Sequence, residues 1–126
     1  MRTVLISPAL DLRLTNPAVP AIAPTDPWLG VDGARELGRQ WAGGLPLTDP
    51  RVSPLLGDLR GLGPMLVLTG TRDILNPDAR DLAARARTAG VDVTLVEREG
   101  ALHVFPLLPI RDAAEARRRI VAALRA

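Results

Sequence analysis

The chain has 126 residues, enough for one domain with its own core, and 47% of its residues are apolar, as in ordinary globular proteins. All of its 16 basic residues are arginines, and 14 acidic residues interspersed with them leave a net charge of only +2. The one basic run, residues 117–119, lies in a helical pattern and indicates a solvated helix face, which argues against a nucleic-acid-binding surface.

The cysteine content and the lengths of the apolar runs indicate the cellular compartment in which the chain is expected. The absence of cysteine excludes disulfides and thiolate chemistry and fits a reducing environment. The first residues carry no long apolar run with a cleavage site, and no segment reaches the length of about 18 apolar residues that a membrane span needs. We therefore expect a soluble, cytoplasmic chain without a membrane span.

The first predicted element is a buried strand at residues 3–7, TVLIS, which Pro8 ends. Residues 11–63 are then rich in proline and glycine and predict an excursion over the surface, such as a cap or lid. One helix is predicted inside it, DGARELGRQWAG, with Asp32 as its cap and with Leu37 and Trp41 on one face.

The second strand and the helix after it are more strongly marked. PMLVLTG, residues 64–70, is a continuous apolar run of the kind found in parallel sheets covered on both faces. In the next helix we expect Asn76 at the N-cap, Pro77 at the first helical position and Gly90 just past the end. Its predicted inward-facing residues are Leu82, Ala83 and Ala86.

The last two elements are a strand and a helix. VDVTLVE, residues 91–97, alternates as a strand does, and DAAEARRRIVAALR forms the final helix. Asp112 and Glu115 have the spacing of a capping box. The predicted buried face of this helix consists of Ala116, Ile120 and Leu124.

The order of these elements predicts an α/β fold in a single domain, residues 1–126, with three parallel strands and right-handed crossovers. The cap-like excursion covers residues 11–50. A strand–helix–strand–helix unit covers residues 64–126. Chemistry in such sheets gathers at the carboxyl ends of the strands, so the loops after the second and third strands are the places to look.

One acid and the chain's only histidine occupy these two loops. Asp73 follows the second strand and His103 follows the third. Neighbouring strands lie about 4.8 Å apart, so a hydrogen bond between the two side chains is geometrically easy. A carboxylate on one imidazole nitrogen leaves the other nitrogen free as a general base. The alternative is structural: a histidine with an ordinary hydrogen bond and an aspartate that caps a helix.

The same segments carry a resemblance to a known family. VLISPALDL, the stretch DPRVSPLLGDLRGLGPMLVLTGTRDILNPDARDLAARARTAGVDVTLVEREGALHVFPLLP and the closing arginine-rich helix resemble the carboxyl-terminal half of hormone-sensitive-lipase-like esterases. The resemblance implies a partial α/β-hydrolase fold in which Asp73 is the acid and His103 the base of a catalytic triad. It also implies a small acyl ester as substrate and a cover over the acyl site formed by residues 11–50.

The substrate pocket is the least specific part of this expectation. Reasonable candidates for its walls are Trp28, Trp41, Phe105 and Leu107, since such pockets are lined mostly by apolar and aromatic side chains. Packing of the same four residues in the core or in the lid is the alternative interpretation.

The sequence departs from the family pattern at the nucleophile. The family needs a serine in G-x-S-x-G and an earlier HGGG-type loop. Ser7 and Ser53 are the only serines, neither has flanking glycines, and each precedes a proline, which disfavours entry into a helix. We therefore expect the nucleophile and the oxyanion donors to come from an upstream segment, and the isolated chain to be inactive.

Other chemistries have less support. One histidine with Asp73 and Asp78 makes a weak metal site, and no glycine-rich phosphate loop follows a strand, so we expect no metal and no cofactor. A rival interpretation is a non-catalytic binding or assembly module, a remnant that self-associates through the exposed edge of its first strand. A third interpretation is that the reading frame is truncated.

Overall fold

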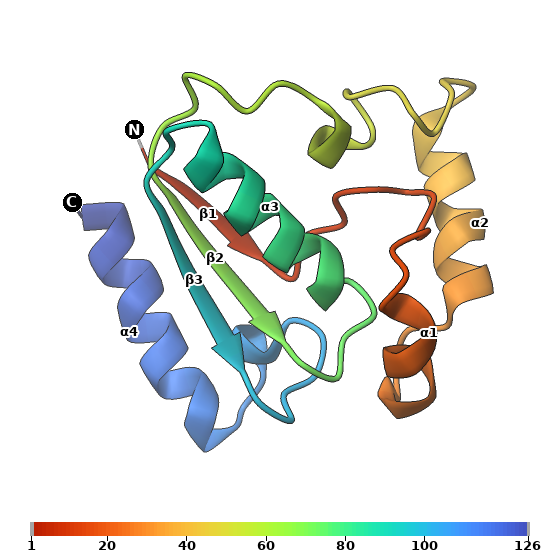
Figure 1. The fold of residues 1–126 in the computed structure, drawn as a ribbon. Helices are drawn as coiled ribbons and strands as arrows, with labels where there is room; N and C mark the ends of the chain where they lie inside the picture. Colours follow the sequence, from red (N-terminus) through yellow and green to blue (C-terminus); the bar gives the residue numbers. More distant parts are fainter. Residues whose placement is uncertain (1, 126) are drawn as a thin grey trace.

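The computed structural model describes residues 2–125 as an α/β fold with one sheet (Figure 1). Its strands are β1 (Thr3–Ile6), β2 (Met65–Gly70) and β3 (Val93–Arg98). Its α-helices are α1 (Val19–Ile22), α2 (Val31–Ala42), α3 (Asn76–Thr88) and α4 (Arg111–Arg125), and short 3-10 turns lie at Ala23–Thr25, Pro54–Leu56 and Phe105–Leu107.

The sheet has the order β1-β2-β3, and both pairs are parallel, as the order of elements predicted. Thr3 pairs with Met65 at the start of β1, and Gly70 pairs with Arg98 at the end of β3. The carboxyl ends of β2 and β3 therefore coincide, which brings the loops after them to one edge of the sheet.

Each face of the sheet packs against one helix. Met65 and Val67 face a cluster that contains Leu82 and Ala86 of α3, whereas Leu66 and Leu68, the alternate residues of β2, face a cluster that contains Ala116 of α4. Figure 1 shows α3 and α4 on either side of the sheet. Because it is covered on both faces, β2 is buried along its whole length, and this explains its unbroken apolar run.

The excursion after β1 forms a third apolar cluster beside the sheet. Leu14 and Val19 pack there against Ile74 and Leu75, which precede α3. α2 approaches the backbone of residue 12 so closely that a Cβ on Gly38 would lie 3.2 Å from the Leu12 Cβ. The excursion is therefore packed onto the loop that follows β2.

Two predicted helix caps are wrong, that of α3 by one residue and that of α2, whose N-cap is Gly30, by two. α3 begins at Asn76 with Leu75 as its N-cap, and the Asn76 side chain donates instead to Thr69 Oγ1 (3.4 Å) and Glu97 Oε2 (2.9 Å). α2 begins at Val31, so Asp32 lies in its first turn with an exposed side chain. Tertiary hydrogen bonds in one case and solvent in the other replace the expected caps.

The face of α4 also differs from the prediction at its end. Ala116 is buried and Ile120 is half-buried, but Leu124 is 65% exposed and Ala123 is buried in its place. The buried positions are spaced three and four residues apart, and the helical period of 3.6 brings residue 123 onto the face that residue 116 occupies. The expected capping-box carboxylates form ion pairs: Asp112 with Arg98 at 2.8 Å, and Glu115 with Arg119 at 2.8 Å.

The helices of residues 2–125 are also too short or too polar for a membrane span: none combines the required length with the required apolar content.

Candidate active site

Asp73 lies three residues beyond the end of β2, in the turn that leads into α3. Its side chain is fully buried. Its Oδ1 accepts a hydrogen bond from the backbone N–H of Leu75 at 2.9 Å, which fixes the carboxylate in the turn and leaves Oδ2 directed away from it. The Asp73 side chain thus stabilises the turn that precedes α3 and does not cap the helix itself.

His103 lies in the loop between β3 and the 3-10 turn at Phe105–Leu107. This loop crosses the end of β2 at Gly70, where a Cβ would lie only 2.2 Å from the Ala101 carbonyl oxygen. The same carbonyl accepts from the backbone N–H of Arg72 at 3.0 Å. Gly70 therefore allows an approach that no other residue type would permit, and this approach places the histidine loop directly above the aspartate loop.

The two side chains meet where the topology predicted. His103 Nδ1 lies 3.0 Å from Asp73 Oδ2, and the imidazole retains 22% exposure while the carboxylate has none. An ionised carboxylate can only accept, so the geometry assigns the ring proton to Nδ1 and leaves Nε2 with a free lone pair.

The electrostatic surroundings favour the protonated ring. The hydrogen bond that the His103 ring donates to Asp73 raises the pKa of His103 above its ordinary value of 6.5, and the charges of Asp73 and Asp26 act in the same direction. Burial of the ring opposes them and lowers the pKa. The buried carboxylate therefore stabilises an imidazolium at this position.

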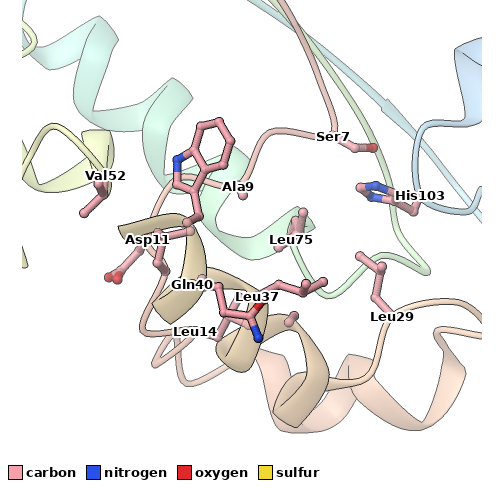
Figure 2. A pocket seen from close by; sticks show the side chains of 14 residues that line it. Ser7, Ala9, Asp11, Leu14, Leu29, Leu37, Gln40, Val52, Leu75 and His103 are labelled. Carbon is pink, nitrogen blue, oxygen red and sulfur yellow. The ribbon is translucent and has the colours of Figure 1, made fainter. Parts of the chain in front are cut away.

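His103 opens onto a cavity of about 800 Å³ (Figure 2). Figure 2 shows His103 and Ser7 at one end of it and Gln40 and Leu37 of α2 on another side. The lining is mostly apolar and comes chiefly from the loop after β1 and from α2: Ser7, Ala9, Asp11, Leu12, Leu14, Leu29, Ala34, Leu37, Gly38, Gln40, Trp41, Val52, Leu75 and His103. The volume is within the range typical of small-molecule sites.

The four proposed wall residues occupy different places. Trp41 lines this cavity, with 78% of its surface exposed. Trp28 and Leu107 are exposed and lie outside the lining, and Phe105 is only 1% exposed and packs in the core between the sheet and α4. The structure thus brings Trp41 alone of these four to the cavity beside His103.

Both serines have structural partners. Ser53 is fully buried, and its Oγ donates to the Leu47 carbonyl (2.6 Å) and accepts from the Leu12 backbone N–H (3.0 Å). Ser7 Oγ accepts from the backbone N–H of Val104 at 2.9 Å. The contact of Ser7 with the residue after His103 was not expected from the sequence, which carries no signal for it beyond the position of Ser7 at a strand end.

The three candidate metal ligands, Asp73, Asp78 and His103, do not form one group in the structure of residues 2–125. Asp78 accepts a hydrogen bond from Asn16 Nδ2 at 2.9 Å and joins α3 to the excursion. Within residues 2–125, no three His, Cys, Asp or Glu side chains lie close enough together to hold a metal ion.

A family model described as the alpha/beta hydrolase fold matches residues 1–107. Solved structures narrow the class: EstE7, a homologue of hormone-sensitive lipase (HSL) from a metagenome library, is 31% identical with a TM-score of 0.89 over 94% of this chain and 42% of that one. A hormone-sensitive lipase from a metagenome library is 32% identical with a TM-score of 0.87 over 97% of this chain and 44% of that one. The chain therefore belongs to the alpha/beta hydrolase fold family and, within it, to the hormone-sensitive-lipase group.

Curated relatives carry related names. A triacylglycerol lipase of Mycobacterium tuberculosis is 37% identical over 74% of this chain, and an acetyl-hydrolase of Streptomyces hygroscopicus is 33% identical over 84% of it. The chain spans only 21% of the first relative and 37% of the second. It is homologous to esterases and lipases, and it corresponds to part of their length.

Proposed function

We propose that this chain supplies the acid and the histidine of a serine carboxylesterase or lipase-like hydrolase of acyl esters. The observation that carries the proposal is the fully buried Asp73 carboxylate 3.0 Å from Nδ1 of a partly exposed His103 at the end of an apolar cavity. In this arrangement Asp73 holds the tautomer, and Nε2 takes a proton from a serine hydroxyl and later returns it to the leaving alcohol.

The nucleophile belongs, in this proposal, to another segment. The sequence contains no G-x-S-x-G, and both of its serine hydroxyls already accept a backbone N–H. The acyl part of the ester would occupy the cavity beside Trp41. The isolated chain is then expected to hydrolyse no ester above the level of its His103→Ala variant.

A chimaera tests the proposal. The part of EstE7 that this chain does not cover is fused ahead of residue 1, and hydrolysis of short acyl esters is measured. Asp73→Asn should lower kcat by about 10⁴-fold, and His103→Ala should lower it by about 10⁶-fold. Asp58→Asn is the matched control, because this exposed carboxylate is held by Arg60 alone. Turnover that survives His103→Ala would exclude the proposed role.

A second proposal, an assembly module, rests on a different observation. β1 pairs with β2 on one side only, and within residues 2–125 no strand pairs with its other side. An apolar strand with a free edge invites pairing with another strand. Light scattering coupled to size-exclusion chromatography tests this directly, and a monomer at all concentrations would count against it.

A further inference from the structure

The loop that carries His103 contains an unusual backbone conformation. Val104, the next residue, has φ +48°, and Ser7, after β1, has φ +44°. The left-handed region is uncommon for residues other than glycine and is particularly unfavourable for a β-branched side chain such as valine. Such a conformation persists only where the surroundings enforce it, so the contacts of Val104 need an explanation.

One hydrogen bond connects these two residues across 97 positions of the sequence. The Ser7 Oγ accepts the backbone N–H of Val104 at 2.9 Å, and Ser7 itself is only 4% exposed. The backbone N–H of Ser7 donates to the Leu68 carbonyl at 2.8 Å, so Ser7 is fixed to β2 as a continuation of the ladder. The hydroxyl is therefore a rigid acceptor presented by the sheet to the histidine loop.

The histidine loop is fixed on its other side by packing. Ala101 lies directly against Gly70, and its carbonyl accepts from Arg72. His103 thus lies between one anchor at Ala101 and one at Val104. Figure 2 shows Ser7 and His103 at the same end of the cavity, and both residues line it.

From this geometry we infer that Ser7 is a positioning residue: its hydroxyl holds the Val104 backbone and thereby keeps His103 within reach of Asp73. The catalytic meaning of this role rests on the proposed function, but the structural role does not. Two carboxylates act on the His103 ring, Asp73 by contact and Asp26 through its charge, so the titration of the ring reports its distance from Asp73.

The test uses the whole chain and two variants of Ser7. Together they distinguish the effect of losing the hydroxyl from the effect of the unfavourable φ. Ser7→Ala removes the hydroxyl and keeps the unfavourable φ, whereas Ser7→Gly removes the hydroxyl and makes the same φ favourable. Because His103 is the only histidine, its ring signals in a nuclear magnetic resonance titration are unambiguous. Both variants should lower the pKa of His103 toward that of the Asp73→Asn variant, and the Val104 amide should exchange about fivefold faster or more.

Ser53→Ala is the matched control, since it also removes a buried hydroxyl that accepts a backbone N–H, but one whose partners are Leu12 and Leu47 and not the histidine loop. It should leave the pKa of His103 and the exchange of Val104 unchanged. If Ser7→Ala does not fold, Ser7→Gly decides the question, because it relieves the backbone. An unchanged His103 titration and unchanged Val104 exchange in folded Ser7→Gly would overturn the inference. Neither readout requires ester turnover, so an inactive chimaera would contradict the proposed function alone.

Discussion

At the scale of single residues, the contact between His103 and Asp73 couples the protonation of the ring to folding. The pKa of His103 is raised in the folded chain because Asp73 accepts from the ring and adds its charge, with Asp26 contributing more weakly. A group that binds its proton more tightly in the folded state stabilises that state when it is protonated. This contribution is fully present below the unfolded pKa and is lost as the pH rises through the folded pKa.

The first prediction follows from that sign. The free energy of unfolding of the wild-type chain should fall as the pH rises from about 6.5 through the folded pKa of His103, and Asp73→Asn should remove most of this fall. Urea denaturation at a series of pH values measures it. His103→Gln provides the control, since it has no titrating ring. A fall of the same size in Asp73→Asn would mean that another group is responsible.

Single residues also mark the limit of what the sequence could predict. Asp73 and His103 were identifiable because each follows an apolar strand, and parallel strands place their carboxyl ends together. The contact of Ser7 with Val104 was not identifiable, since it depends on two left-handed residues and on the course of a loop. Phe105 marks the same limit, since it was expected in the wall of the pocket but packs in the core. A loop has no regular periodicity, so the sequence does not show which side chains of the loop point inward.

At the scale of elements, the excursion is tied to the aspartate loop by one carboxylate. Asp26 Oδ2 accepts from the backbone N–H of Ile74 at 2.9 Å, and its Oδ1 accepts from Trp28 and Leu29 at 2.9 Å each. Beside it, Arg72 Nε donates to the Thr25 carbonyl at 3.0 Å. A segment that lines the cavity is therefore attached immediately next to Asp73.

A second prediction tests this attachment. Asp26→Ala leaves three backbone N–H groups without their acceptor and should lower the free energy of unfolding by about 1–2 kcal/mol. Hydrogen exchange should become faster in residues 19–42, while β2 and β3 keep their protection. Asp58→Ala, which loses only local contacts with Arg60, is the control. Faster exchange spread equally over the sheet would show that Asp26 does not act as a local attachment.

The elements whose signals are local in the sequence were predicted, whereas features that depend on tertiary contacts were missed or misplaced. The strands and α3 were found because apolar runs, Pro77 and Gly90 mark them, and Gly90 indeed adopts φ +82° just after the helix. α1 has four residues and was missed, since so short a helix forms through its packing in the cluster around Val19. The error in the N-cap of α3 also comes from tertiary contacts, because the Asn76 side chain donates to Thr69 and Glu97 and does not cap the helix.

At the scale of the whole molecule, β1 has one edge with which no strand within residues 2–125 pairs, and this edge presents specific hydrogen-bonding groups. Thr3 donates its backbone N–H to the Pro64 carbonyl at 2.9 Å, and Ser7 donates to the Leu68 carbonyl at 2.8 Å, both toward β2. Successive N–H groups of a strand in a parallel ladder point to opposite sides. The N–H groups of Val4 and Ile6 therefore point to the open edge, where a further strand would find them.

The third prediction uses this alternation to test the assembly proposal. Val4→Pro deletes an outward N–H but leaves the bonds of β1 to β2, and proline is tolerated at such edge positions. Thr3 is extended, as a residue before proline must be. If β1 pairs with another strand, the wild-type chain should associate with increasing concentration in light scattering, and Val4→Pro should shift it toward the monomer. Val4→Ala, which loses the side chain and keeps the N–H, separates packing from hydrogen bonding. Equal association of the proline and alanine variants would place the contact elsewhere, because only pairing through the strand edge depends on that backbone donor.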